Sequence, residues 1–255
     1  MLKQLLAAAA WRLAPGVMVR QHLMRRKAGL EPELWLVPRL LAGRSRAIDV
    51  GANRGVWSVQ LARSARAVEA FEPNPACVRE LRRVVGGRVR IHSVALSDHA
   101  GQATLRFDPG NTGVATIERS NTLTQNAGIR RIVEANVPVA TLDSFGFDDV
   151  GLIKIDVEGH EEAVLRGATQ TLRTGRPSLV VETEDRHNPG APARVEALLR
   201  AAGYAALVLH EAELVTTDEA RRRNLRLGAP DGLNNFVFVP VERMEALGLQ
   251  EGARC

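Results

Sequence analysis

The sequence has little cysteine, since only Cys77 and Cys255 among its 255 residues carry a thiol. Two cysteines form neither a disulfide framework nor a zinc cluster, which excludes both kinds of stapled domain. No apolar run approaches the roughly 20 residues that a membrane-spanning helix needs. No internal repeat is visible, and 45% apolar with 25% charged residues is typical of a globular chain. The length then predicts one large domain or two small ones.

Acidic residues are absent from the first 28 positions. The whole chain carries a formal charge of +5 and a pI near 10, which taken alone favours a nucleic-acid partner. The N-terminal stretch accounts for the entire excess, so the rest of the chain is close to neutral. We expect this basic stretch to pack on the body, to mediate homo-oligomerisation or to lie on an anionic membrane surface. Its six basic residues are Lys3, Arg12, Arg20, Arg25, Arg26 and Lys27.

In this interpretation a basic helical arm, residues 1–43, precedes a body of residues 44–255. Arg12 interrupts the short apolar stretch near the start, which is not the form of a signal peptide. We therefore expect a cytoplasmic protein that can touch a membrane surface. Apolar residues at helical spacing and the helix-breaking Pro15-Gly16 predict three helices, over residues 1–14, from there to about residue 27, and over residues 32–41.

Strands alternate with helices in the body, which predicts right-handed crossovers and the mostly parallel sheet of an α/β fold. Asn74-Pro75 marks a helix start, because asparagine suits the N-cap and proline the first helical position. The last two strands are expected to close the sheet as an antiparallel hairpin. The predicted strands cover residues 47–50, 67–71, 88–94, 150–155, 178–182, 204–210 and 235–239.

Residues 98–140 interrupt this alternation. Short strands are predicted over residues 103–107 and 137–141, with a polar segment rich in glycine, asparagine and threonine between them. A connection of that length is usually functional or mobile. We interpret residues 108–136 either as a lid over the binding site of a substrate, or as a disordered surface insertion.

The first group of candidate site residues is Asp49-Val-Gly-Ala-Asn-Arg-Gly55, which follows a strand and opens a helix. Glycine lets backbone approach a ligand, and a helix start offers unpaired N–H groups. A dinucleotide fingerprint would read G-x-G-x-x-G, whereas this loop reads G-x-N-x-G with an acid two residues before it. A carboxylate there suits the ammonium of an amino-acid group better than a pyrophosphate. The alternative is a tight strand–helix turn capped by Asp49.

Glu72 ends the second predicted strand, 21 positions after Gly51. An acid at this place can accept hydrogen bonds from both hydroxyls of a ribose. NAD enzymes share the feature, so it indicates a nucleoside without saying which one. The alternative is a surface glutamate favoured by the dipole of the next helix, and the nearby glycine-containing loop weakens it.

A third group, Asp156-Val-Glu-Gly-His160, follows a central strand. Ligands of open α/β sheets bind at the carboxyl ends of the strands, where Asp156 lies. Glu158 and His160 are candidates for a general base. Asp156 and Glu158 could also bind a divalent cation, but two hard ligands do not define a site, so metal dependence stays open.

These motifs resemble, in kind and in order, those of FkbM-type methyltransferases. The resemblance covers about residues 44–240. It implies a class I methyltransferase (Rossmann-like) fold, with a seven-stranded, mostly parallel sheet ending in an antiparallel hairpin, and S-adenosylmethionine as cofactor. It also implies O-methylation of hydroxyls on sugars, polyketides and similar metabolites. The motifs are Ile48-Asp-Val-Gly-Ala-Asn-Arg-Gly55, Phe71-Glu-Pro-Asn-Pro75, Val94-Ala-Leu-Ser-Asp98, Thr141-Leu-Asp143 and Lys154-Ile-Asp-Val-Glu-Gly-His-Glu161.

The resemblance also implies roles by position. An alcohol must lose a proton when it is methylated, so we expect His160 or Glu158 to act as the base while Asp156 positions cofactor or substrate. The loop from Asp49 would hold the methionine part of the cofactor and Glu72 the ribose. The implied cofactor-binding residues are Asp49, Gly51, Ala52, Asn53, Gly55, Glu72, Asp156 and, beside the adenine, Ser93, Val94 and Ala95.

Three rival interpretations are open. An NAD-dependent oxidoreductase would need the third glycine, which is missing. A nucleic-acid methyltransferase would use the basic arm, but the sequence has no N-P-P-Y/F motif and no Pro-Cys pair. An inactive scaffold would have no need of Asp49, Glu72 and Asp156. We therefore expect a small-molecule or glycan acceptor, and no nucleic-acid partner.

Overall fold

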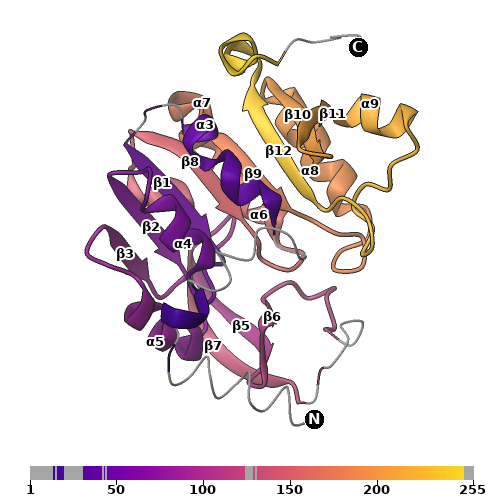
Figure 1. Cartoon of the computed structure of the whole chain (residues 1–255). Helices are drawn as coiled ribbons and strands as arrows, with labels where there is room; N and C mark the ends of the chain where they lie inside the picture. The colour runs from indigo at the N-terminus through magenta and orange to yellow at the C-terminus, as the bar shows by residue number, and fades with distance from the viewer. Residues whose placement is uncertain are drawn as a thin grey trace.

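Figure 1 shows the computed structural model of the chain. The structure describes residues 14, 16–19, 31–41, 43, 45–123, 129 and 131–249. The helix predicted over residues 1–14 lies outside the described residues except for residue 14, and of the next predicted helix only a helical stretch at residues 16–19 is described. All six basic side chains of the arm also lie outside the described residues. The division into an arm and a body stays a prediction.

An eight-stranded sheet forms the centre of the molecule, in the strand order β11-β10-β12-β9-β8-β1-β2-β3. The strands from β9 to β3 are parallel, and β12 runs antiparallel between β9 and β10. The predicted α/β fold with a terminal antiparallel pair is thus confirmed. The strands are β1 (Arg46–Val50), β2 (Ala67–Phe71), β3 (Val89–His92), β8 (Val150–Ile155), β9 (Ser178–Glu182), β10 (Tyr204–His210), β11 (Glu213–Thr216) and β12 (Asn235–Pro240).

β11 is an addition to the seven predicted strands. The chain reverses at Glu211 and Ala212, whose φ angles of 49° and 71° are left-handed. The following residues then pair antiparallel with β10, with Val215 opposite Val208. The sequence signal for this turn is weak, because it contains neither glycine nor asparagine.

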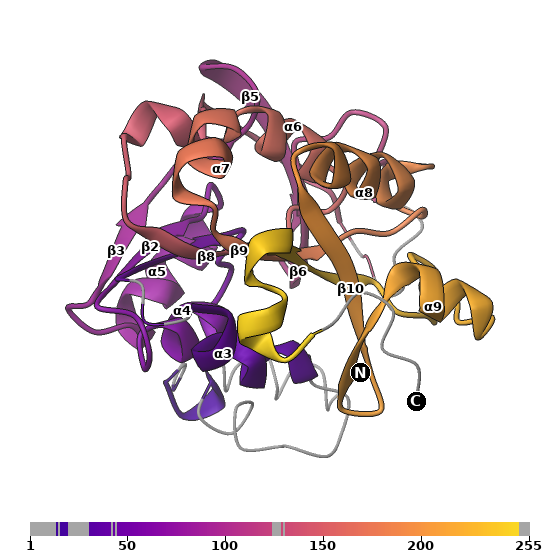
Figure 2. The same ribbon diagram turned by 90° about the horizontal axis from the view of Figure 1, so that it is seen from above.

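Helices cover both faces of the sheet. Figure 2 shows α6, α7 and α8 on one face and α3 and α4 on the other. Asn74 caps α5 as predicted, since its side-chain oxygen accepts a hydrogen bond of 2.9 Å from the amide of Ala76. The α-helices are α3 (Val37–Leu41), α4 (Val56–Leu61), α5 (Pro75–Val84), α6 (Glu161–Arg166), α7 (Thr169–Gly175), α8 (Ala191–Ala201) and α9 (Thr217–Arg222), and the 3-10 helices are η1 (Pro32–Leu36), η2 (Leu142–Phe145), η3 (Val241–Arg243) and η4 (Glu245–Leu247).

Alternate residues of the central strands point into two separate cores. Ile48 and Ile153 pack with α6, α7 and α8, whereas Ala47 and Leu152 pack with α3 and α4. Because side chains two apart in a strand share a face, Asp49 and Lys154 lie on the α3 and α4 side. The third predicted helix, residues 32–41, is present as η1 and α3, and its buried leucines belong to that same core.

A second, four-stranded sheet in the order β4-β7-β5-β6 forms beside the main one. This corrects the expectation of an irregular segment over residues 108–136, since Asn111–Thr116 pairs antiparallel with β5. The third predicted strand is also shorter, because the chain leaves the main sheet after His92 and residues 95–96 join β7 instead. Residues 124–128 and 130 lie outside the described residues. The strands are β4 (Ala95–Leu96), β5 (Gly101–Asp108), β6 (Asn111–Thr116) and β7 (Val133–Ala140).

Among the described residues, no helix combines the length and the apolar character that crossing a bilayer requires.

Candidate active site

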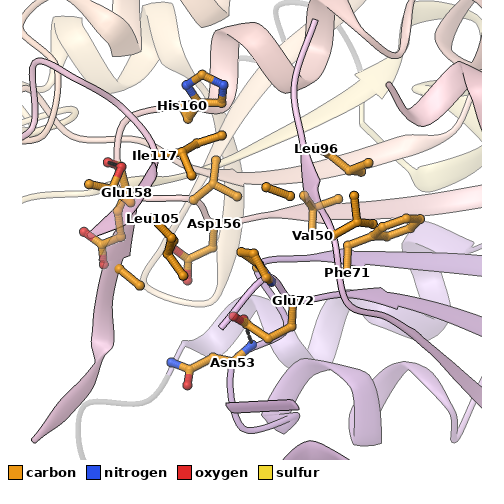
Figure 3. A pocket seen from close by; sticks show the side chains of 17 residues that line it. Val50, Asn53, Phe71, Glu72, Leu96, Leu105, Ile117, Asp156, Glu158 and His160 are labelled. Atoms are coloured by element: carbon orange, nitrogen blue, oxygen red, sulfur yellow. Dashed lines mark hydrogen bonds between the residues drawn. The ribbon is translucent and has the colours of Figure 1, made fainter. Parts of the chain in front are cut away.

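A hollow at the carboxyl ends of β1, β2 and β8 collects most of the predicted site residues, and the second sheet closes it with Leu105 and Thr116. We call it the cofactor hollow. In Figure 3, Asp156 lies between Glu72 and Asn53 on one side and Glu158 and His160 on the other. Eight predicted residues line it, namely Gly51, Asn53, Glu72, Val94, Ala95, Asp156, Glu158 and His160, whereas Asp49, Ala52, Gly55 and Ser93 do not.

The loop after β1 requires glycine at its first position. Gly51 has a φ of 82°, and a Cβ atom there would lie 1.8 Å from the backbone oxygen of Asp156. No side chain fits such a contact, so this glycine lets β1 and β8 approach each other where both strands end. Gly55, with a φ of 86°, precedes α4 and packs against Leu81. Both glycines therefore shape the loop, and only Gly51 borders the hollow.

Asp49 lies beneath this loop and is 1% exposed. Its Oδ2 atom accepts a hydrogen bond of 2.5 Å from the hydroxyl of Ser58 in α4. Burial raises the pKa of Asp49 to about 6, although Ser58 and the charge of Lys154 act in the opposite direction. Asp49 thus anchors the loop to α4, and Ala52 points into a small core with Ala70 instead of into the hollow.

Glu72 sits at the end of β2 with both carboxylate oxygens engaged by backbone. One oxygen accepts a 2.7 Å hydrogen bond from the amide of Asn53, and the other accepts one of the same length from the amide of Asn74. Burial raises the pKa of Glu72 to about 7 against these two hydrogen bonds. A carboxylate oxygen has two lone pairs, so each can still accept from a ligand hydroxyl.

The apolar wall of the hollow comes from the ends of β2 and β4. Phe71 stacks on the ring of His92 with centroids 4.6 Å apart, and Val94 and Ala95 line the hollow beside it. Ser93 is exposed and lies outside the lining, although it is the first of the three predicted adenine neighbours. The wall where the sequence predicts the adenine thus includes the apolar side chains of Val94 and Ala95 but not Ser93.

Asp156 and Glu158 follow β8 and differ in their surroundings. Burial and the neighbouring charge of Glu182 raise the pKa of Asp156 well above its usual range. Oε2 of Glu158 lies 2.9 Å from Nε2 of His187. Burial alone lowers the pKa of His187, but the carboxylates of Glu158 and Glu184 raise it above its usual value. The carboxyl group of Glu158 therefore faces the imidazole of His187.

His160 is held from both sides. Its Nε2 atom lies 2.9 Å from the hydroxyl of Ser97, and its Nδ1 atom lies 3.0 Å from Oε2 of Glu118. Burial raises the pKa of Glu118, but hydrogen bonds from His160 and Ser120 outweigh it and hold the pKa below its usual value. Glu118 is thus ionised at neutral pH and fixes the tautomer with hydrogen on Nδ1. A base oriented by a third group is the arrangement that nucleophile activation needs.

Comparison with known proteins identifies the family. The sequence profile described as the methyltransferase FkbM domain matches residues 49–206, which is more than half of the chain. The chain belongs to the FkbM methyltransferase family. It is 30% identical over 189 residues to the 31-O-demethyl-FK506 methyltransferase FkbM of Streptomyces tacrolimicus, covering 61% of this chain and 71% of that protein. It is 28% identical over 189 residues to the methyltransferase sdnD of Sordaria araneosa, covering 62% and 72%.

A solved structure of this family has the same fold. The methyltransferase FkbM of Methylobacillus flagellatus KT superposes with a TM-score of 0.51 at 15% identity, over 77% of this chain and 44% of that one. This confirms the class I methyltransferase fold. The present chain spans less than half of that protein.

The family uses S-adenosylmethionine, and the residues of the hollow fit this cofactor. Glu72 is a buried acid at the end of β2 with free lone pairs, and Val94 and Ala95 offer an apolar wall for a base. Asn53 is held beside Glu72 by the amide hydrogen bond described above. Within the described ranges, no group of three or more His, Cys, Asp or Glu side chains is placed to hold a metal ion.

Two residues of this FkbM site are absent from the sequence-based assignment. Ser97 lies inside the motif Val94-Ala-Leu-Ser-Asp98, so it could have been found by asking why that motif holds a serine. Glu118 carries no such signal, because it lies 42 positions before its partner His160 and in a segment of unremarkable composition. Only the folding of the second sheet brings it to the site.

Proposed function

We propose that this protein transfers the methyl group of S-adenosylmethionine to a hydroxyl of a sugar, a polyketide or a similar small metabolite. The observation that supports it best is the base arrangement of His160 and Glu118 beside the cofactor hollow. A hydroxyl needs such a base, since it loses its proton on methylation. The name of the Streptomyces relative refers to an O-methylated position, which agrees with this chemistry.

Different residues of the hollow would contact different parts of the cofactor. Glu72 would accept from the ribose hydroxyls, Val94 and Ala95 would flank the adenine, and the loop at Gly51 and Asn53 would carry the methionine part. When bound, the cofactor supplies an electrophilic methyl group on a sulfonium. The task left to the protein is to align the acceptor oxygen and to exclude water.

His160 is the base that the contacts favour over Glu158. Nδ1 of His160 donates to the ionised Glu118, which leaves the lone pair of Nε2 as the proton acceptor. The hydroxyl of Ser97 lies 2.9 Å from Nε2 and would donate to that lone pair. An acceptor hydroxyl would take the place of Ser97, and Glu118 would stabilise the imidazolium that forms.

Glu158 has a different task in this proposal. Its backbone oxygen accepts hydrogen bonds from the side chains of Thr116 at 2.9 Å and Asn121 at 2.7 Å. The second sheet thereby holds the loop that carries Asp156 and His160. Asp156 borders the hollow between the two groups and would position cofactor or substrate.

A methyl-transfer screen over hydroxylated metabolites, with the product mass and the methylated position determined, tests the proposal. His160→Ala should then lower kcat by about a hundredfold to ten-thousandfold, the usual contribution of a general base. Its affinity for S-adenosylhomocysteine should stay within about twofold of wild type. Full turnover by His160→Ala on the identified acceptor would refute the base assignment. Methylation of RNA or DNA in the same screen would favour the nucleic-acid alternative.

A further inference from the structure

A second cavity opens at the carboxyl edge of β9, beside the cofactor hollow. It has a volume of about 340 Å³, far more than a single water needs. Glu31 and Glu33 line it from the start of η1, and Glu182 lines it from the end of β9. Leu209 and the residues before β12, among them Asn235, complete the wall. We call it the acidic cavity.

The acidic cavity adjoins the place where methyl transfer would occur. β8 and β9 are parallel neighbours with Ile155 opposite Val181, so the next residues, Asp156 and Glu182, end the two strands side by side. Asp156 borders the cofactor hollow and Glu182 borders the acidic cavity. A molecule that fills the cavity can therefore extend toward the cofactor across this pair of carboxyl groups.

The buried side chain of Lys154 lies beside this group of acids. Nζ of Lys154 lies 3.6 Å from Oε2 of Glu182 and 3.8 Å from Oε2 of Glu31. It also donates a hydrogen bond of 3.1 Å to Oδ1 of Asn235. Trp57 donates its indole N–H to Glu31 as well. Lys154 is thus shared between two carboxylates and a side-chain amide, and it lies 1% exposed behind them.

Glu33 is left without such a partner. It is 5% exposed, and its Oε2 atom has no hydrogen-bond partner among the described residues. A buried carboxylate oxygen without a hydrogen bond costs free energy, which a ligand that supplies a donor would offset. Burial raises the pKa of Glu33 to about 7, in spite of the charge of Lys154. A cation in the cavity would favour the ionised form of Glu33.

We propose that the acidic cavity binds a protonated amine of the methyl acceptor, so that the substrate is a hydroxyl compound with an ammonium group. This rests on the proposed methyl transfer and names its substrate class. A metal ion is a poorer occupant, because the carboxylates here do not form a metal-ligand group. Leu209, Leu233 and Pro32 add apolar wall beside the acids, which suits an amine on a carbon frame. An anionic acceptor would meet three carboxyl groups and be rejected.

The test uses three small probes that each have four carbon atoms, n-butylammonium, n-butanol and butyrate, with ligand-observed NMR on the full chain. We expect butylammonium to bind more tightly than the other two, and Glu33→Gln to weaken it at least about tenfold, as for loss of a buried charged hydrogen bond. Glu245→Gln is the matched control. It removes the same charge from an exposed position in η4, beyond the opposite end of β12.

Each outcome decides the proposal. Equal binding of the three probes, absence of butylammonium binding, or an unchanged affinity in Glu33→Gln would overturn it. Displacement of butylammonium by S-adenosylhomocysteine would also overturn it, because the cavity would then take the cofactor's own amino group. Calorimetric binding of S-adenosylhomocysteine shows that each variant is folded. If wild type fails to bind it, the proposed function fails, whereas binding without an amine preference overturns only the substrate class.

Discussion

Replacing Glu118 by glutamine keeps a hydrogen-bond acceptor beside His160 and removes its negative charge. The two side chains are 3.0 Å apart at their nearest polar atoms, and they are 21% and 14% exposed. At that distance and an effective dielectric constant of about 20, the carboxylate stabilises an imidazolium by about 5 kcal/mol. Solvent screening at a partly exposed pair reduces this to about 3 kcal/mol. Glu118→Gln should therefore lower kcat roughly a hundredfold.

The assay follows single-turnover methyl transfer to the acceptor found in the screen, with S-adenosylhomocysteine affinity measured in parallel. Glu118→Gln should lower kcat while the affinity for S-adenosylhomocysteine stays within about twofold, because Glu118 does not border the cofactor hollow. Glu134→Gln, an exposed charge removal in β7 of the same sheet, is the control. Turnover of Glu118→Gln within about threefold of the control would refute the role of the carboxylate in stabilising the imidazolium.

Two further predictions concern buried carboxyl groups. Glu72→Ala leaves the amides of Asn53 and Asn74 without their acceptors. The free energy of unfolding, measured in urea, should therefore fall by about 2–6 kcal/mol, and S-adenosylhomocysteine binding should be lost. Unchanged stability would contradict this prediction. Burial raises the pKa of Glu161 from 4.5 to about 7, so its folded form binds a proton more tightly and stability is lost as pH rises from 4.5 to 7. Glu161→Gln keeps an acceptor for the amide of Gly159. It should reduce that loss of stability by up to about 3 kcal/mol. If the free energy of unfolding of the variant changes with pH between 5 and 7 as it does in wild type, Glu161 is not the group responsible.

The main sheet could be predicted because its signals are local. Buried parallel strands are short apolar runs, and the run over Ala67–Phe71 ends as predicted. The start of α5 follows from one capping asparagine and one proline, which act within three residues. The strand over Asn111–Thr116 has no such signal. Its sequence Asn-Thr-Gly-Val-Ala-Thr is poor in strand formers, and pairing with β5 decides its conformation.

The cofactor side of the site was predictable for a related reason. The glycine-containing loop and the acid at the end of the next strand are short motifs that can be recognised in the sequence. Parallel strands then bring their carboxyl ends, and with them these motifs, to one edge of the sheet. The structural reason why a particular residue occupies its position was harder to predict. Gly51 was expected to admit a ligand, yet the atom that excludes a side chain there is the backbone oxygen of Asp156. That contact depends on the packing of β1 against β8.

The acceptor side could not be derived in this way, because its groups come from distant parts of the chain. The second sheet brings Glu118 to His160. Glu33 lies at the end of β9 because η1, which precedes β1 in the chain, lines the acidic cavity there. Neither acid belongs to a sequence motif, and the surroundings of each acid in the fold set its pKa. Hydrogen bonds from His160 and Ser120 hold the pKa of Glu118 below its usual value in spite of burial, whereas Glu33 is a buried acid with an unpaired oxygen. In the proposed function, the residues for the cofactor thus lie in local motifs, whereas the residues for the acceptor are brought together by long-range packing.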